Sequence, residues 1–210
     1  MPPVVLKVEV PLASFRASRA REYMETYDVP PPATIYGMLL SLVGETNRYK
    51  HCGVRIAVVL LSEPTRSVVL RKFHRHKVGE PYHPSNIRPD FQEVLTDIRF
   101  MVWVDGAKDQ AEICLADRIF QAFEKPTDVD RFGGLSLGES QFLVNSVNLI
   151  SEESLEGLGT WLIQNGSGHL SLPHWVDHVG ARGTRWHLYS LQESCLKRPP
   201  DSSWIGIQPA

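Results

Sequence analysis

Positive charge is concentrated between Arg66 and Lys77, in the segment RSVVLRKFHRHK, which contains no Asp or Glu. Its basic and imidazole side chains are Arg66, Arg71, Lys72, His74, Arg75, His76 and Lys77. Phosphate backbones attract such clusters through counterion release, and Phe73 or a histidine ring can stack on a base. A solvent-exposed strand edge protected by Lys and Arg would have the same composition. The segment therefore indicates either RNA contact or protection of a strand edge.

The histidines of this segment also admit an enzymatic interpretation. A general base beside cationic groups can cleave RNA through its 2′-hydroxyl, and His74 and His76 lie beside Lys72 and Lys77. This arrangement would be a metal-independent ribonuclease. Stacking or phosphate contact explains the same residues, so we predict no catalytic residue here and keep the ribonuclease as the alternative.

A metal site is not predicted. His174 and His178 are four residues apart, but Pro173 and Trp175 flank His174 and no carboxylate or cysteine completes a ligand set. We likewise predict no cofactor, because the chain has neither a Walker motif nor a dinucleotide-binding fingerprint.

Two further segments can approach an anion. Arg16, Arg19 and Arg21 follow the first expected strand and should emerge near the start of a helix at Thr34, where backbone N–H groups are free. The glycine-rich run GGLSLGES, residues 133 to 140, lets another backbone approach closely. A nucleotide backbone is one candidate ligand for this turn, and a plain loop is the alternative.

The elements that must position these residues follow from hydrophobic periodicity. Alternation over residues 4–10 predicts a strand, and the apolar spacing after Thr34 predicts a helix capped by Thr34 and ended by Gly44. The apolar run 54–61 predicts a central strand, with residues 67–73 paired beside it. Residues 74–90 are rich in proline and polar groups, which indicates an exposed loop or hairpin arm.

A second strand–helix–strand series follows before the composition changes. A strand over 98–104, a helix over 109–123 and a last strand near 141–150 complete a β-α-β-β-α-β order. This order predicts an α+β fold with a ferredoxin-like (RNA-recognition-motif) domain over residues 1–150 and a protruding arm at about 74–90. Strand-like pieces at 160–164, 185–192 and 204–207 predict a smaller β-rich C-terminal extension over 151–210.

Bulk composition narrows the class of protein. The 210 residues are 42% hydrophobic and carry a net charge of −2, so a real core is expected and any nucleic-acid site must be a local patch. Cys52, Cys114 and Cys195 form neither a disulfide framework nor a zinc ribbon. With no signal-peptide pattern and no run of roughly 18 apolar residues, the chain is expected to be cytoplasmic, with no membrane partner.

One segment resembles a known family. Residues 14–45, SFRASRAREYMETYDVPPPATIYGMLLSLVGE, are similar to the N-terminal signature of the CRISPR-associated protein 5 family. That signature is a Ser-Phe-Arg, a proline run, and a Thr-x-Tyr-Gly that opens an apolar helix. The run GGLSLGES resembles the second glycine-rich segment of the same family.

The resemblance implies a non-catalytic subunit of a type I CRISPR Cascade effector. Such a subunit binds the 5′ handle of the CRISPR RNA (crRNA), contacts the Cascade backbone subunit through a thumb, here the arm, and meets the large subunit. Target DNA is then reached indirectly, by base pairing with the guide. Matching positions imply handle contacts by Ser14, Arg16, Thr34, Tyr36 and residues 136–140, with Arg16 on phosphate and Tyr36 stacking or hydrogen bonding.

Together the two lines of reasoning predict one set of RNA-binding residues. They are Ser14, Arg16, Arg19, Thr34, Tyr36, Arg71, Lys72, His74, Arg75, His76, Lys77, Gly134, Ser136, Leu137, Gly138 and Ser140. One branch of the family processes precursor crRNA, which keeps the ribonuclease alternative open. A generic RNA-recognition-motif protein is the third hypothesis, disfavoured because the RNP1 aromatic pattern is absent.

Overall fold

The computed structural model describes residues 2–74, 79–80, 82–152, 155–179 and 181–209. Over these residues the chain is a mixed α+β protein with one large, mainly antiparallel sheet and two α-helices, α1 (Pro32–Leu42) and α2 (Leu115–Glu124). The strands are β1 (Val4–Ala13), β2 (Tyr23–Met24), β3 (Arg55–Leu60), β4 (Thr65–His74), β5 (Ile87–Asp105), β6 (Ser146–Leu149), β7 (Leu158–Gln164), β8 (Leu170–Trp175), β9 (Arg185–Cys195) and β10 (Ile205–Gly206). Short 3₁₀ turns occur at Pro84–Asn86, Pro126–Asp128 and Asp201–Ser203.

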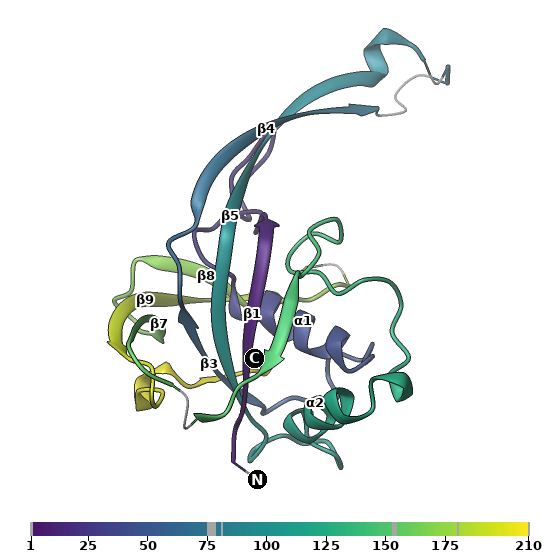
Figure 1. The fold of residues 1–210 in the computed structure, drawn as a ribbon. Coiled ribbons are helices and arrows are strands. Elements are labelled where there is room, and N and C mark those ends of the chain that lie inside the picture. The colour runs from purple at the N-terminus through teal and green to yellow at the C-terminus, as the bar shows by residue number, and fades with distance from the viewer. Residues whose placement is uncertain (1, 75–78, 81, 153–154, 180, 210) are drawn as a thin grey trace.

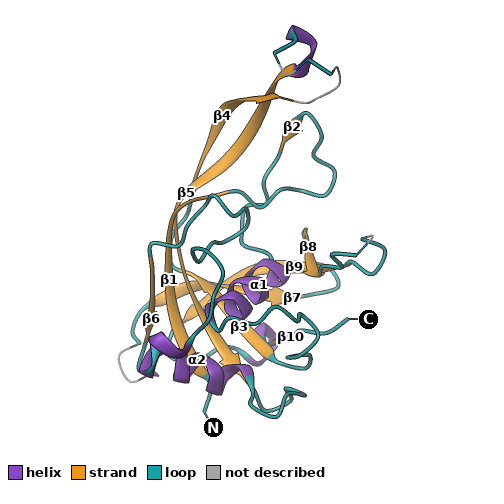
Figure 2. Ribbon diagram, turned by 90° about the vertical axis from the view of Figure 1, so that its right-hand side faces the viewer, coloured by secondary structure: helices purple, strands orange, loops and turns teal. Residues whose placement is uncertain are grey.

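The sheet is organised around β5, which is 19 residues long. Its order is β6-β1-β5-β3-β7-β9-β8, and the C-terminal half of β5 pairs with both β1 and β3. The N-terminal half of β5 instead pairs with β4, from Thr65↔Thr96 to His74↔Ile87. Because β5 extends beyond its neighbours, the β4–β5 hairpin projects from the body as an arm (Figures 1 and 2).

Both faces of the central strands are buried. Val58 and Val102 belong to the larger core under the helices, whereas their neighbours Val59 and Trp103 belong to a second core on the opposite face. Side chains alternate between faces along a strand, so two covered faces require continuous apolar runs. This explains why β3 after Arg55 and residues 100–104 of β5 are apolar without alternation.

The helix predicted after the proline run is present, but its predicted start is wrong. α1 begins at Pro32 with Pro31 as its N-cap and no side-chain cap, so Thr34 lies inside the first turn. Proline suits that turn because its fixed φ is helical and it has no N–H to leave unsatisfied. The predicted end is confirmed: Gly44 follows the helix with φ +67°, where an added Cβ would overlap the backbone of Asp130.

The second helix is also shorter than predicted. α2 begins at Leu115, because the Asp109 carboxylate accepts hydrogen bonds from the backbone N–H groups of Ala111 and Leu115 and holds the intervening turn open. Side-chain acceptors of this kind compete with helical hydrogen bonds. Ile113, which falls within the predicted helix range 109–123, is half exposed before the helix starts.

One predicted strand pairing is wrong. Residues 67–73 do form a strand, but β4 pairs with β5 and not with β3. The free side of β3 is taken by β7 and β10, which come from the far end of the chain. The arm is consequently longer than the predicted residues 74–90, since it starts with β4 at Thr65.

The C-terminal residues continue the same sheet. The predicted strands at 160–164, 185–192 and 204–207 are present as β7, β9 and β10, and the last strand predicted near 141–150 is β6. β8 was not predicted, because Pro173 and His174 interrupt any strand pattern. Through β8, this region also contacts α1. The division of the chain at residue 150 stays a prediction.

Candidate functional site

A groove of about 520 Å³ combines three segments that lie far apart in the sequence. α1 contributes Thr34 and Gly37, the glycine-rich turn contributes Ser136 and Gly138, and the loop after β8 contributes His178. Three of these residues, Thr34, Ser136 and Gly138, were predicted as RNA contacts. The volume lies within the range of about 300–1,000 Å³ typical of ligand sites.

The glycine-rich turn lies directly on the Ser-Phe-Arg segment. Gly138 has φ +87°, and a Cβ added there would lie 2.6 Å from the Ser14 carbonyl oxygen and 3.3 Å from the Phe15 ring. A side chain at this position would therefore push the turn away from residues 14 and 15. The Ser14 hydroxyl is buried and has no hydrogen-bond partner among the described residues. The two predicted motifs are thus brought into contact by the fold.

Arg48 is a groove residue that the sequence analysis missed. Its Nη2 donates to the Ala33 carbonyl at 2.8 Å, its Nη1 lies 3.0 Å from His178 Nε2, and its guanidinium carbon lies 5.5 Å and 5.4 Å from the centres of the Tyr36 and Trp175 rings. Burial lowers the pKa of Arg48. Nothing in the polar turn GETNRYK distinguishes this arginine from a solvated one.

Tyr36 lies beneath the groove with no exposed surface. Its hydroxyl donates to the Arg48 carbonyl at 2.8 Å, and burial raises the pKa of Tyr36, which keeps that donor protonated. The predicted stacking of Tyr36 on a base has no surface to occur on in this structure. The ring instead holds the segment that carries Arg48.

The groove also contains one carboxylate, Glu45, and one exposed aromatic, Phe132. Lys50 lies 2.8 Å from Glu45 and Arg118 forms a second ion pair with it; these hydrogen bonds lower the pKa of Glu45 to about 2 even though burial opposes the shift. The charge of Glu45 is therefore already matched. Phe132 is fully exposed at the groove and offers a stacking surface.

Two arginines of the arm's basic segment, Arg66 and Arg71, are engaged by other side chains. Arg66 pairs with Asp28 and Glu93, and Arg71 bonds to Gln92 and Gln141 and lies 3.5 Å from Glu139. Lys72 and His74 are exposed. The predicted contacts Arg75, His76 and Lys77 lie outside the described residues.

The remaining predicted residues have mixed positions. Arg16 is exposed and donates to the Ala20 carbonyl at 3.0 Å, and Arg19 lines a separate hollow beside Tyr27 and Trp186. Leu137 is buried in the core, so that only its backbone can reach a ligand. Gly134 and Ser140 are exposed in the glycine-rich turn.

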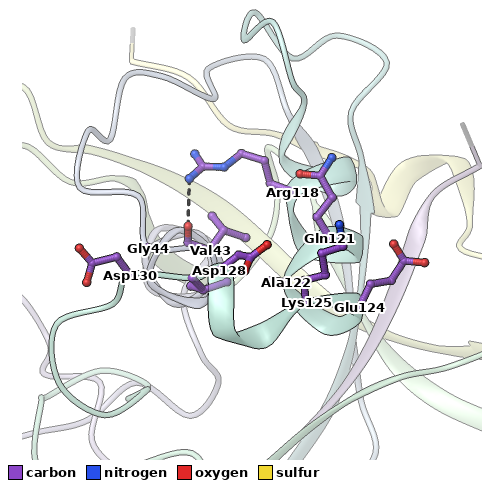
Figure 3. A pocket seen from close by; sticks show the side chains of 10 residues that line it. Val43, Gly44, Arg118, Gln121, Ala122, Glu124, Lys125, Asp128 and Asp130 are labelled. Carbon is purple, nitrogen blue, oxygen red and sulfur yellow. Dashed lines mark hydrogen bonds between the residues drawn. The ribbon is translucent and has the colours of Figure 1, made fainter.

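A second hollow of about 620 Å³ lies between the end of α1 and α2 (Figure 3). Its acidic residues are Glu124, Asp128 and Asp130, and Arg118 is occupied by Glu45 and by the Val43 carbonyl at 2.9 Å. Lys125 is the remaining cation of the lining. This acidic balance does not suit a phosphate backbone.

The histidines singled out above are separated by the fold. His174 is buried and lies 2.9 Å from the Tyr189 hydroxyl, whereas His178 lies at the groove beside Arg48. Among the described residues, no group of three or more His, Cys, Asp or Glu side chains is placed to hold a metal ion. No helix in the described part of the chain is long and apolar enough to cross a membrane.

Comparison with known proteins gives a consistent result. Residues 4–204 match the model of the family described as "CRISPR-associated protein (Cas_Cas5)". A protein of Myxococcus xanthus (strain DK1622), named CRISPR-associated protein Cas5, is 43% identical over 195 residues, which are 90% of each chain. A chain of a solved structure named "CRISPR RNA-guided surveillance complex" has a TM-score of 0.64 at 16% identity, over 96% of this chain and 95% of that one.

Proposed function

The chain belongs to the CRISPR-associated protein Cas5 family, and from this premise we propose that it binds and caps the 5′ handle of a crRNA in a type I CRISPR Cascade effector. In this role it is a non-catalytic subunit. The handle-binding surface is the groove between α1, the glycine-rich turn and the loop after β8, together with the exposed arginines after β1.

The observation that carries this proposal is the contact between Gly138 and Ser14, beside the start of α1. The start of α1, the glycine-rich turn and the loop after β8 line one groove that has an arginine in its wall and an exposed aromatic ring, Phe132. Single-stranded RNA is recognised by stacking on aromatic rings combined with contacts to phosphates. The groove provides both kinds of contact.

We further propose that the fold is ferredoxin-like at its centre. The order β6-β1-β5-β3, with α1 between β1 and β3 and α2 between β5 and β6, supports this assignment. A generic RNA-recognition-motif protein reads RNA on an open sheet face. Here both faces of β3 and β5 are buried, which argues against that alternative.

The arm is proposed to contact the neighbouring Cascade backbone subunit. β4 is exposed along most of its length, and Val68, Val69 and Leu70 expose 51%, 42% and 56% of their surface. Exposed apolar residues gathered on a projecting hairpin are typical of a protein–protein contact. The large subunit and the target DNA are the further partners of the assembled complex.

The test is binding of the purified chain to a crRNA with its native 5′ handle and to one with that handle scrambled, across a salt series, with the RNA examined on a denaturing gel. We expect tighter binding of the native handle with intact RNA. Handle-dependent cleavage without added metal, abolished by substituting His74, would replace the proposal by the ribonuclease alternative. Equal binding of both RNAs would remove the handle from the proposed function.

A further inference from the structure

Arg48 is a half-buried cation for which the described residues provide no carboxylate partner. Its Nε is buried without a hydrogen-bond partner, and the two contacts it makes through Nη1 and Nη2 are to a neutral carbonyl and an imidazole. An arginine cannot relieve such a charge by losing its proton. A partly buried charge without a counter-ion is costly, so an anion in the groove is the partner that would offset the cost.

We propose that Arg48 binds a phosphate group of the RNA and that the segment Thr34 to Gly37 supports it there. The proposal rests on the function proposed above and deepens it. In this proposal Tyr36 supports Arg48 and does not itself contact the RNA.

The support for Arg48 comes from consecutive residues of α1. The Tyr36 hydroxyl fixes the Arg48 backbone through its carbonyl, and the Ala33 carbonyl fixes Nη2. Gly37 leaves room for the guanidinium, since an added Cβ would already be in contact with Nη1 at 3.7 Å. The rings of Tyr36 and Trp175 restrict the guanidinium further. A cation held in one orientation binds an anion with little loss of entropy.

The surroundings of Arg48 favour a nucleotide phosphate over a carboxylate of another protein. The uncapped start of α1 lies at the same groove, and its positive dipole end attracts anions. Thr34 and Ser136, which carry hydroxyl groups, line the same groove, and Phe132 offers a stacking surface. The charge of Glu45 is matched by Lys50 and Arg118, so it does not compete for Arg48.

The first test compares the salt dependence of RNA binding for Arg48→Gln, Arg48→Lys and a control, Arg99→Gln. Arg99 is half exposed, pairs with Asp97 at 3.0 Å and does not line the groove. Loss of one phosphate contact makes the plot of log association constant against log salt concentration less steep by about 1. We expect this change for Arg48→Gln only, whereas Arg48→Lys keeps the slope and binds a few-fold more weakly because it lacks the planar fork.

The second test locates the phosphate. Handle RNAs are synthesised with one uncharged methylphosphonate linkage at each position in turn, and each is bound to the wild type and to Arg48→Lys and Arg48→Gln. One linkage should weaken wild-type binding by roughly ten-fold or more, as expected for a hydrogen bond to a charged group. That penalty should shrink in Arg48→Lys and vanish in Arg48→Gln.

The outcomes separate this proposal from the function on which it rests. A wild-type preference for the native handle, with unchanged slope and unchanged methylphosphonate penalties in the Arg48 variants, overturns the role of Arg48 and leaves handle binding standing. If the Arg48 variants keep the wild-type salt dependence of RNA binding but no longer assemble with the protein partners, Arg48 makes a protein contact. That outcome also overturns the proposed phosphate contact. The native-handle and the scrambled-handle RNA are both measured with every variant. The salt dependence of binding therefore still tests Arg48 even if the wild type shows no handle preference. If Arg48→Gln does not fold, Arg48→Lys decides through its methylphosphonate penalty.

Discussion

The arm and the groove differ in how the fold treats their charges. The arm has the densest basic segment of the sequence, yet Arg66 and Arg71 are engaged by side chains of other segments. The groove contains a single arginine from an ordinary polar turn, Arg48, and it is held between aromatic rings without a carboxylate partner in the described part of the chain. Local charge density in the sequence therefore did not identify which cation is available to a ligand.

The comparison extends to packing. β4 packs on one strand only and leaves apolar side chains in solvent, whereas the groove is built on α1, whose apolar side chains are buried in the core. A projecting hairpin suits contact with a neighbouring subunit, and a rigid concave site suits a bound nucleotide chain.

The largest expected effect comes from removing the distal part of the arm, beyond Val68, Val69 and Leu70. Residues 72–89 are replaced by Asn-Gly, a two-residue turn that closes the register pair Arg71↔Asp90. Because the described residues of this stretch lie outside both cores, we expect the isolated chain to keep its melting temperature within a few degrees. Recovery of this chain with a tagged Cascade backbone subunit should be lost. Intact complex containing the shortened chain would contradict a contact by the distal arm and would restrict the proposed contact to the retained part, which includes Val68, Val69 and Leu70.

The next effect contrasts one aromatic residue from each region. Phe132→Ala should weaken handle binding by roughly 1–3 kcal/mol, about 5- to 150-fold, if its ring stacks on a base. Phe73 on the arm, whose ring lies 5.2 Å from the Arg71 guanidinium carbon, is the matched site. Phe73→Ala should change RNA affinity much less in a fluorescence titration. A larger loss of affinity in Phe73→Ala than in Phe132→Ala would place base stacking on the arm.

A pH effect should separate the groove from the arm. Burial, aided by nearby His187, lowers the pKa of His174 from 6.5 to about 4. Below pH 6.5 the unfolded chain therefore takes up a proton that the folded chain does not. As the pH is lowered from 6.5 to about 4, the free energy of unfolding decreases. Between pH 6.5 and 5 the loss is at most about 2 kcal/mol, from 1.36 kcal/mol per unit.

His174 precedes Trp175, which supports Arg48, so we expect acid to weaken the groove before the arm. Urea unfolding at pH 6.5 and pH 5 measures the stability loss, and RNA binding at the same pH values measures the groove. His174→Gln should flatten the dependence of stability on pH, while the exposed control His169→Gln should retain it. If the free energy of unfolding of His174→Gln depends on pH as strongly as that of the wild type, other titrating groups cause the pH effect.

The smallest effect concerns charge on the arm alone. Lys72 is exposed, whereas Arg71 bonds to Gln92 and Gln141. If the arm contacts a phosphate, Lys72→Gln should lower the salt slope of RNA binding by about 1, and Arg71→Gln should leave it unchanged. Equal slopes for both variants and the wild type would limit phosphate contact to the groove.

Much of the secondary structure was predictable because it follows from local periodicity. The strands β1, β3, β7 and β9 and the helix ended by Gly44 were all recognisable from side-chain patterns. The errors have local or tertiary causes. The Asp109 carboxylate delays α2, and β4 pairs with β5 because later strands occupy the side of β3.

The candidate site was predictable only in part. Thr34, Ser136 and Gly138 were found from motifs, since glycine and hydroxyl residues mark close backbone approach. Arg48, His178 and Phe132 were missed, because each comes from a segment whose composition is ordinary. Tyr36 was found but given a contact that its burial prevents in this structure.

By itself, the sequence determined both helices and most of the strands, the place of the glycine-rich turn and the resemblance to the family, because periodicity, turn residues and motifs depend on neighbours along the chain. Tertiary structure alone decided which cations are paired and which three segments share a groove. Burial and ion pairing depend on residues distant in the sequence, such as Glu139 beside Arg71 or Trp175 beside Arg48. No local pattern in the sequence encodes those distances.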